Sequence, residues 1–192
     1  VNDSPIITEV SNQVIDEDTS LTLELSAVDV DNEELTFSAS GDNVSLNINN
    51  NNLEVVPNSD YNGSVNIIVS VTDGELSDET EFTLTVNPVN DAPSLSGLDD
   101  AEIDEDGVYT LELSGADVDG DVLTFQASLD GNGSVSIEGS TLTVAPELNY
   151  NGDILVTVIA TDGQLSDQTT FTLSVNAVND APVIDVLANQ SI

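Results

Sequence analysis

The stretches FTLTV at residues 82–86 and FTLSV at residues 171–175 decide the fold of this chain. In both, apolar side chains alternate with polar ones, and LTLEL at 21–25 and YTLEL at 109–113 follow the same rule. Alternation with a period of two is typical of a β-strand that buries one face. The sequence therefore predicts half-buried sheets, although its charge and its few aromatic residues are more typical of a disordered chain.

The charge of the chain restricts its partners. Its 192 residues include 37 Asp and Glu but no Lys, Arg or His, and the formal net charge is −37. Nucleic acids and anionic membrane surfaces would repel such a chain. Metal ions are the expected neutralisers, above all Ca²⁺, which takes hard oxygen ligands. The absence of Cys and His removes the usual ligands of zinc and copper. No apolar run is long enough to span a bilayer, so no direct membrane insertion is expected.

The sequence repeats itself at long range. VNDSP at the start of the chain returns twice as VNDAP, and Asn2, Asn90 and Asn179 mark the three copies, 88 and then 89 residues apart. We expect two complete domains, residues 1–89 and 90–178, and the truncated first strand of a third repeat in residues 179–192. The chain is therefore interpreted as a piece of a longer array.

Each copy contains about seven short segments of strand character, bounded by Asn, Asp, Gly and Ser. In the first copy these lie near 5–9 with 13–15 as one interrupted strand, and near 20–26, 35–39, 44–48, 52–56, 64–71 and 79–86. Regular spacing without helical periodicity predicts an all-β fold, namely two tandem seven-stranded antiparallel β-sandwiches with Ig-like Greek-key connections. The side chains expected to point inward are Leu21, Leu23, Leu25, Phe37, Leu46, Ile48, Val55, Phe82, Leu84 and Val86.

The acidic residues that recur in register fall at turns rather than at inward strand positions. Asp29 and Asp31 lie in DVD, and Asp73 lies in TDG, each after a predicted strand. The loops of a sandwich gather at its two ends, and counting strands places DVD and TDG at the same end. Asp60 and the connection to the next copy belong at the opposite end.

If the domains stack end to end, the carboxylates of the first copy meet those of the second. Such a group cannot stay ionised without a cation among its members. The irregular geometry of Ca²⁺ suits ligands from several turns better than the tight octahedron of Mg²⁺. The residues expected at this junction are Glu17, Asp60, Asn87, Asn90, Asp91, Asp117, Asp119 and Asp162. Weaker, partial sites are expected from Asn2, Asp3, Asp29, Asp31 and Asp73, and from Glu105, Asn149, Asn176 and Asp180.

Taken together, these motifs resemble the cadherin superfamily, specifically the bacterial cadherin-like tandem repeats of large extracellular surface proteins. The resemblance covers nearly the whole chain and is carried by IDED at 15–18, SDYNG at 59–63, NPVND at 87–91, ADVD at 116–119 and TDG at 161–163. It implies that the residues named above hold Ca²⁺ between successive domains. It also implies a secreted or cell-surface protein, in which this segment is a calcium-rigidified spacer or takes part in adhesion to like repeats on neighbouring cells.

Other functions fit the sequence less well. An EF-hand is excluded, because counted from Asp117 its sixth position is Val122 and its twelfth is Ser128 rather than Gly and Glu. Catalysis is not expected, since most nucleophile–base pairs need residue types that the chain lacks, and no asymmetric carboxylate pair stands out. A calcium-dependent polysaccharide-binding module remains the alternative, although the chain has no Trp and only three Tyr.

Several conspicuous residues are expected to have no ligand role. Tyr61 and Tyr150 recur in register in the YNG turns, so we expect them to pack at the core or at a corner of the sandwich. The acidic residues expected on solvated faces are Glu33, Glu34, Asp78, Asp99, Asp100 and Asp167.

Overall fold

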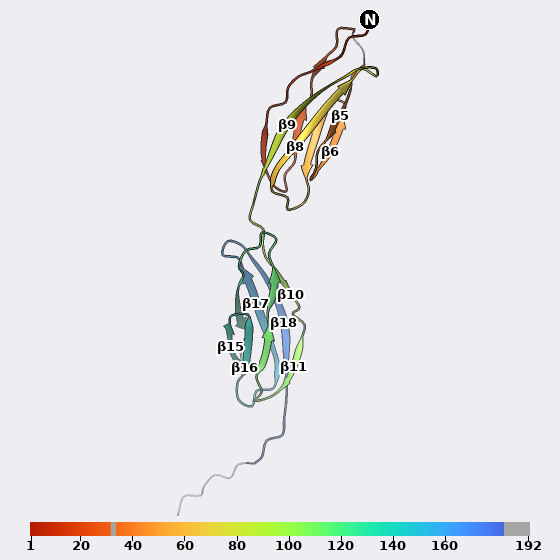
Figure 1. Ribbon diagram of the computed structural model, residues 1–192. Coiled ribbons are helices and arrows are strands. Elements are labelled where there is room, and N and C mark those ends of the chain that lie inside the picture. The colour runs from red at the N-terminus through yellow and green to blue at the C-terminus, as the bar shows by residue number, and fades with distance from the viewer. Residues whose placement is uncertain (32–33, 183–192) are drawn as a thin grey trace, which may run out of the picture. The chain divides into compact units, whose positions relative to one another are not determined.

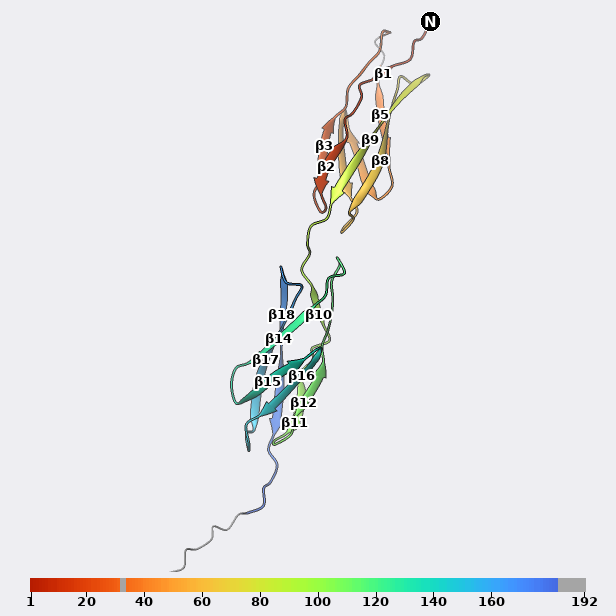
Figure 2. The same ribbon diagram turned by 60° about the vertical axis from the view of Figure 1, so that its left-hand side comes forward.

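The computed structural model describes residues 1–31 and 34–182, and within these residues it contains strands and no helix. The described residues divide into two compact units, the first within residues 1–89 and the second beginning at Asn90 (Figure 1). Each unit consists of two facing sheets, which the turned view separates most clearly in the second unit (Figure 2).

The first unit has a four-stranded sheet in the order β2-β9-β8-β5 and a three-stranded sheet in the order β3-β7-β6, while β1 and β4 form a separate short ladder. The strands are β1 (Ile6–Ile7), β2 (Gln13–Asp16), β3 (Leu21–Glu24), β4 (Ala27–Val28), β5 (Thr36–Ser40), β6 (Val44–Asn49), β7 (Asn52–Pro57), β8 (Gly63–Thr72) and β9 (Ser77–Asn87).

The second unit repeats this topology strand for strand. Its sheets have the orders β11-β18-β17-β14 and β12-β16-β15, with β10 and β13 as the short ladder. The strands are β10 (Ser94–Ser96), β11 (Ala101–Asp104), β12 (Tyr109–Glu112), β13 (Ser114–Ala116), β14 (Thr124–Leu129), β15 (Gly133–Glu138), β16 (Thr141–Pro146), β17 (Gly152–Thr161) and β18 (Ser166–Asn176).

The predicted fold class is confirmed, with one addition to the strand pairing. The sheets pair antiparallel except where the first strand of each unit joins the last one: β2 runs parallel to β9, and β11 runs parallel to β18. The first strand begins in the ladder with β4 or β13, leaves it, and continues beside the last strand. This change of partner explains the interruption that the sequence showed between residues 9 and 13.

The core of each unit lies between its two sheets. In the first unit all the side chains predicted to point inward are either buried in the core or packed against it. The strands β8 and β17, each ten residues long, contribute further buried residues such as Ile67 and Val69, which are fully enclosed. Burying a large aliphatic side chain contributes about 1.5–3 kcal/mol, so these strands anchor the units and fix the positions of their end loops.

Tyr61 and Tyr150 pack against the cores of their units, as predicted. The hydroxyl of Tyr150 donates to the carbonyl oxygen of Asp153 at 2.9 Å, and that of Tyr61 donates to Ser64 at 3.3 Å. The chain passes close beneath each ring at a glycine with positive φ. A Cβ added to Gly152, whose φ is 134°, would lie 3.0 Å from the Tyr150 hydroxyl oxygen. These glycines therefore let the ring close over the corner.

Candidate metal-binding sites

Five residues gather at one end of the first unit, and we call them the Asp29 group: Asn2, Asp3, Asp29, Asp31 and Asp73. The loop after β4 supplies Asp29 and Asp31, and the loop after β8 supplies Asp73. The start of the chain ties these loops together. The Asn2 side-chain amide donates to Asp73 Oδ2 at 2.9 Å, and the Asp3 backbone N–H donates to Asp31 Oδ2 at 2.8 Å.

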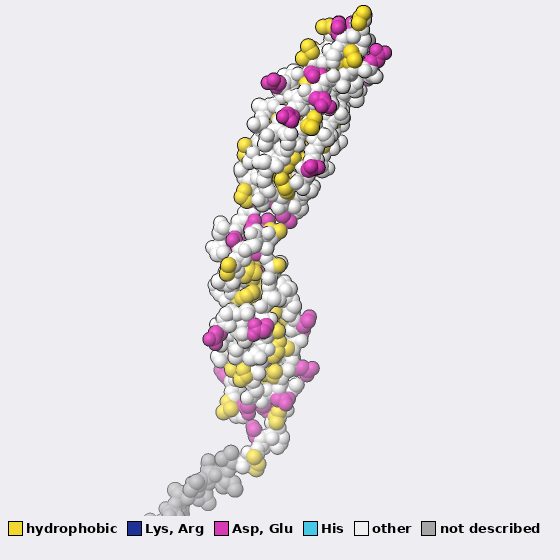
Figure 3. Space-filling model, viewed as in Figure 1, with side chains coloured by type: hydrophobic (Ala, Val, Ile, Leu, Met, Phe, Trp, Pro, Cys, Tyr) yellow, Lys and Arg dark blue, Asp and Glu magenta, His cyan; other side chains and the backbone are white. Residues whose placement is uncertain are grey.

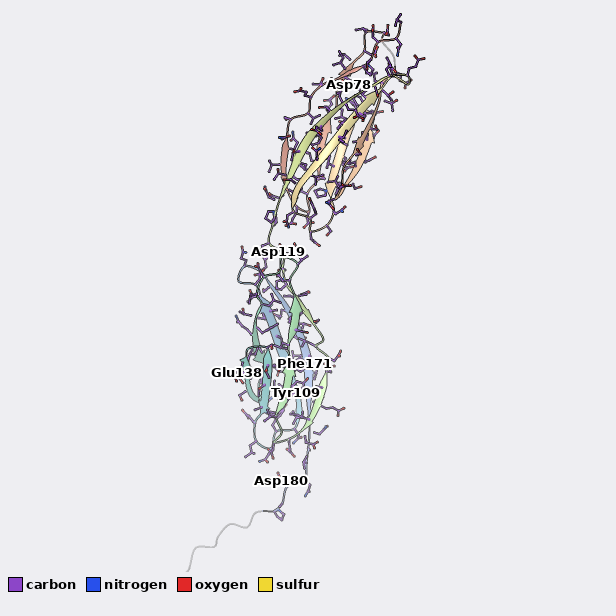
Figure 4. The ribbon with its side chains drawn as sticks, viewed as in Figure 1. Asp78, Tyr109, Asp119, Glu138, Phe171 and Asp180 are labelled. Carbon is purple, nitrogen blue, oxygen red and sulfur yellow. The ribbon has the colours of Figure 1, made fainter. Side chains whose placement is uncertain are left out.

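The second unit builds the same arrangement from its own loops, the Asp117 group: Asn90, Asp91, Asp117, Asp119 and Asp162. The Asn90 amide donates to Asp162 Oδ2 at 2.7 Å, and the Asp91 backbone N–H donates to Asp119 Oδ2 at 2.8 Å. Figure 4 shows Asp119 at one end of the second unit and Asp180 beyond the opposite end. The sequence motif VND therefore performs the same structural task in both repeats, namely to connect the two acidic loops of its own unit.

In each group, a buried oxygen of the first aspartate of the DVD motif lacks a hydrogen-bond donor. Asp29 Oδ1 accepts the backbone N–H of Asp31 at 2.7 Å, and Asp117 Oδ1 accepts that of Asp119 at 3.0 Å. The second oxygens, Asp29 Oδ2 and Asp117 Oδ2, are buried and have no hydrogen-bond partner. A buried polar atom without a partner costs about 1–3 kcal/mol, and more when it carries charge. A cation is the partner that would satisfy a carboxylate oxygen in these acidic surroundings.

Asp73 and Asp162 are held in their ionised forms by their loops. The backbone N–H groups of Leu76 and Glu75 lower the pKa of Asp73 below its ordinary value, and the Asn2 amide adds to this effect. The Asn90 amide lowers the pKa of Asp162 most, followed by the N–H groups of Gln164 and Leu165. Hydrogen bonds to a carboxylate favour its charged form. Both side chains therefore present anionic oxygens, which are the ligands that Ca²⁺ prefers.

The Asp29 group borders a hollow of about 600 Å³. Asn2, Asp31, Asp73, Gly74 and Glu75 line it together with Val1. The hollow is bounded mainly by oxygen-bearing side chains and has no cationic side chain nearby, because the chain contains none. Its chemistry suits a hydrated cation rather than an apolar ligand.

The opposite end of the first unit carries the Glu17 group: Glu17, Asp60 and Asn87. Glu17 is only 3% exposed, and its Oε1 accepts the backbone N–H of Val89 at 2.6 Å. Its own N–H donates to the carbonyl oxygen of Asn87 at 3.0 Å. Asp60 precedes β8 and Asp73 follows it, so a strand of ten residues, roughly 33 Å long, separates the two groups.

In the second unit the Glu105 group, formed by Glu105, Asn149 and Asn176, occupies the same place. Glu105 Oε1 accepts the backbone N–H of Val178 at 2.5 Å, and the Glu105 N–H donates to the carbonyl oxygen of Asn176 at 2.8 Å. Beyond it, the Asn179 side chain donates to the carbonyl oxygen of Asp180 at 3.2 Å, as Asn90 does to Asp91 at 3.0 Å. The third copy of VND thus begins with the same local turn.

Three acidic residues near these ends were missing from the predicted set. The Asp60 backbone N–H donates to Asp18 Oδ1 at 3.3 Å, and that of Asn149 donates to Asp106 Oδ1 at 2.9 Å. The Asn87 amide donates to Asp16 at 3.0 Å. The signal was present in the motif IDED, which repeats in both copies with all three of its acidic positions kept.

Two residues expected on solvated faces have a structural role, so that prediction was wrong for them. Asp78 Oδ2 accepts the backbone N–H of Ile7 at 2.9 Å, and Asp167 Oδ2 accepts that of Leu95 at 2.8 Å. Both carboxylates hold the first strand of their unit against the last one. Asp100 is exposed, as predicted, although it accepts the N–H of Thr172 at 2.6 Å, and Glu34 and Asp99 are exposed as well. Glu33 lies outside the described residues.

Each of the two units matches the sequence model of a known domain family. Residues 89–176 match the family model of the cadherin-like domain. The second repeat is a cadherin-like domain. Residues 2–87 match the model of the bacterial Ig domain, a fold of the same sandwich type. The predicted resemblance to bacterial cadherin-like repeats is thereby confirmed, and such domains are typically non-catalytic and usually extracellular.

Solved structures and one curated relative extend this comparison. The chain is similar to human protocadherin-24 EC1-2 at 17% identity and a TM-score of 0.53, covering 93% of this chain and 99% of that one. It is also similar to Drosophila N-cadherin EC1-4 at 14% identity and a TM-score of 0.50, covering 91% and 50%. A protein named chitinase A from Pseudoalteromonas piscicida is 28% identical over 93% of this chain, which spans only 22% of that relative. No helix in the described residues could cross a membrane.

Proposed function

We propose that the Asp29 and Asp117 groups bind Ca²⁺. The observation that carries the proposal is the pair of buried carboxylate oxygens, Asp29 Oδ2 and Asp117 Oδ2, which lack a hydrogen-bond donor at equivalent places in the two repeats. Each lies in a loop that also presents a second carboxylate, Asp31 or Asp119, with a third nearby on Asp73 or Asp162. Without a cation, the carboxylates of these neighbouring loops would oppose one another's ionisation.

The donor atoms favour Ca²⁺ over other metals. Carboxylate and amide oxygens are hard ligands, and no Cys or His is available for zinc or copper. Ca²⁺ accepts six to eight oxygens in an irregular shell, whereas Mg²⁺ requires a tighter octahedron. A shell assembled from two loops and the start of the repeat suits the larger ion, with water completing it.

We further propose that the chain is a spacer or adhesion segment of an extracellular protein. In this proposal residues 1–89 and 90–178 are successive repeats and residues 179–192 open a third. The Glu17 and Glu105 groups then supply ligands to ions shared with the repeat that follows. Support for this role comes from the match of the second repeat to the cadherin-like domain and from the recurrence of the same acidic loops in both repeats.

The test is a pair of double variants with the same change in charge. Asp29→Asn with Asp117→Asn alters the two carboxylates that own the unpartnered oxygens, while Glu54→Gln with Glu138→Gln alters one exposed strand residue in each unit. Calorimetric titration with Ca²⁺ should show weakened binding for the first variant and parental binding for the second. Parental affinity in the first variant would overturn the assignment of these aspartates.

A second candidate function is carbohydrate binding. It is favoured by the curated relative named chitinase A, in which the matched segment is 22% of the length. A non-catalytic segment of a polysaccharide-degrading protein could hold it on its substrate or keep its domains apart. Retention on polysaccharide, measured with Ca²⁺ and with EDTA, separates binding from a purely spacing role.

A further inference from the structure

The outer face of the four-stranded sheet in the second unit lacks charge at its centre. Six outward-facing side chains form two rows across three strands, and we call them the neutral face: Gln126, Ile159 and Gln168 in one row, and Ser128, Thr157 and Thr170 in the other. The strand β14 contains no acidic residue, and the acidic residues of β17 and β18 are Asp153 and Asp167, outside both rows. In a chain of net charge −37, such a neutral array is unexpected.

At the matching positions in the first unit, two side chains are charged and form hydrogen bonds with neighbouring side chains. Glu79 and Glu81 stand where the second unit has Gln168 and Thr170. Glu79 accepts a hydrogen bond from Ser70 at 2.9 Å, and Glu81 accepts one from Asn66 at 3.1 Å. That face is charged, and its donors Ser70 and Asn66 already bond to the two glutamates.

On the neutral face the hydrogen-bonding groups remain available. Within the described part of the chain, the side chains of Gln126, Ser128, Thr157, Gln168 and Thr170 form no hydrogen bond. Each hydroxyl can donate and accept, and each Gln amide offers two donors and an acceptor. Neighbouring strands lie about 4.8 Å apart and successive outward residues about 6.7 Å apart, so these groups form a regular grid. Ile159 and Leu155, which is 43% exposed, place apolar surface on the central strand of this grid.

We propose that the neutral face binds an uncharged, extended glycan chain. A sugar chain presents hydroxyls that both donate and accept, and its ring faces are apolar, which matches the polar outer strands and the apolar residues of β17. Polyanions would be repelled by the acidic surroundings. A second protein copy is a poorer fit, since a stable interface needs about 800 Å² per partner with an apolar centre. The inference rests on the second candidate function and is independent of Ca²⁺.

The experiment places two residues of the first repeat at the matching positions of the second. Gln168→Glu with Thr170→Glu gives the second unit the side chains that the first unit already carries at Glu79 and Glu81, so the fold should be kept. The control, Ser134→Glu with Ser136→Glu, adds the same charge to exposed positions on the other sheet. The chain and both variants are tested for retention on colloidal chitin and on cellulose, in EDTA and in Ca²⁺.

The expected result is retention of the chain and of the control variant on at least one of these neutral polysaccharides. Retention of Q168E/T170E should fall about tenfold or more, because each added carboxylate removes neutral donors and must be desolvated. The pattern should be the same in EDTA, so that a failure of calcium binding would leave it unchanged. Failure of the parent chain to bind either polysaccharide would overturn the proposal, as would equal losses in both variants. Sedimentation showing a dimer that only Q168E/T170E dissolves would assign the face to a second copy instead.

Discussion

The two oxygens of Asp117 have different tasks, and so do those of Asp29. In each case Oδ1 closes the turn by accepting a backbone N–H, and Oδ2 is buried without a donor. An Asn at either position can keep its one oxygen to close the turn, but it then places an amide nitrogen where the anionic Oδ2 stood. Loss of metal binding and loss of loop structure can therefore be separated at this residue.

Asp167 should matter for stability rather than for metal binding. Replacing it with Ala leaves the partly buried N–H of Leu95 without its acceptor, which should lower the free energy of unfolding by about 1–3 kcal/mol. Chemical denaturation in EDTA measures the change. The control Glu138→Ala removes an exposed carboxylate and should change stability by less than about 0.5 kcal/mol. Equal effects of the two substitutions would contradict the role of Asp167 in holding β10.

Glu112 provides a pH-dependent prediction away from the metal sites. The hydroxyl groups of Thr141 and then Ser140 donate to it and lower its pKa below the ordinary 4.5. Because the folded-state pKa is depressed, the stability that Glu112 contributes is fully present above about pH 4.5 and is lost as the pH falls through the lowered pKa. NMR titration of the carboxyl carbon should show that Thr141→Val raises this pKa. An unchanged value in the variant would contradict the assignment.

At the scale of the element, the strands illustrate what the sequence could predict. Period-two alternation located them to within one or two residues, since inward positions must be apolar wherever two sheets face each other. For example, the predicted strands 44–48 and 52–56 became Val44–Asn49 and Asn52–Pro57. The alternation does not encode partners, however. The parallel pairing of β2 with β9 depends on where the chain leaves its first ladder, and no local pattern specifies that position.

The residues of the candidate sites also divide into those that the sequence predicted and those that it did not. The recurrence of DVD, TDG and VND in register identified the Asp29 and Asp117 groups, because a repeated acidic turn is rarely needed for packing alone. Asp18 and Asp106 escaped notice because their partners are backbone N–H groups of a turn distant in sequence. Asp78 and Asp167 were misjudged for a similar reason. A carboxylate that caps a strand N–H looks the same in sequence as one that faces water.

The corner formed by Tyr150 and Gly152 should tolerate no side chain at the glycine. Gly152→Ala imposes a φ of 134° on a residue with a Cβ and brings that atom to 3.0 Å from the tyrosine hydroxyl. We expect a loss of about 2–3 kcal/mol in unfolding free energy. Gly139→Ala is the matched control, since its φ is also positive, at 64°, but no atom lies within 4 Å of the added Cβ. It should cost about 1–2 kcal/mol. A larger loss at Gly139 would refute the steric argument.

At the scale of the whole molecule, the main feature is the net charge of −37. Acidic side chains are spread over the visible surface without any Lys, Arg or His between them (Figure 3). Self-repulsion among like charges destabilises a compact state, and bound cations or screening salt reduce it. Screening by salt and binding of cations differ in specificity. Sodium ions screen all the carboxylates, whereas Ca²⁺ acts at the loops that hold several of them.

This distinction gives a thermal prediction. In EDTA, the melting temperature should rise as NaCl is increased from low to high concentration, because the Debye length shortens to about 3 Å at 1 M. Millimolar Ca²⁺ at constant ionic strength should raise it further, by the equivalent of about 2.7 kcal/mol for each site at a hundredfold excess over its dissociation constant. Mg²⁺ at the same concentration controls for divalent screening. Equal melting temperatures in Ca²⁺ and Mg²⁺ would exclude selective sites.

The parallel pairing of β2 with β9, and of β11 with β18, has a mechanical consequence. When tension pulls the two ends of a repeat apart, antiparallel neighbours at the termini would unzip one hydrogen bond at a time. Parallel terminal strands are instead pulled past each other in opposite directions, so all the bonds between Gln13–Asp16 and Leu84–Asn87 bear the load together. The short ladder of β1 should detach first at low force, and the parallel pair should then resist. In a single-molecule pulling experiment, Thr85→Pro should lower the rupture force of the first repeat only, because Thr85 lies opposite Val14 and its N–H, like that of Thr83, points from β9 toward the first strand.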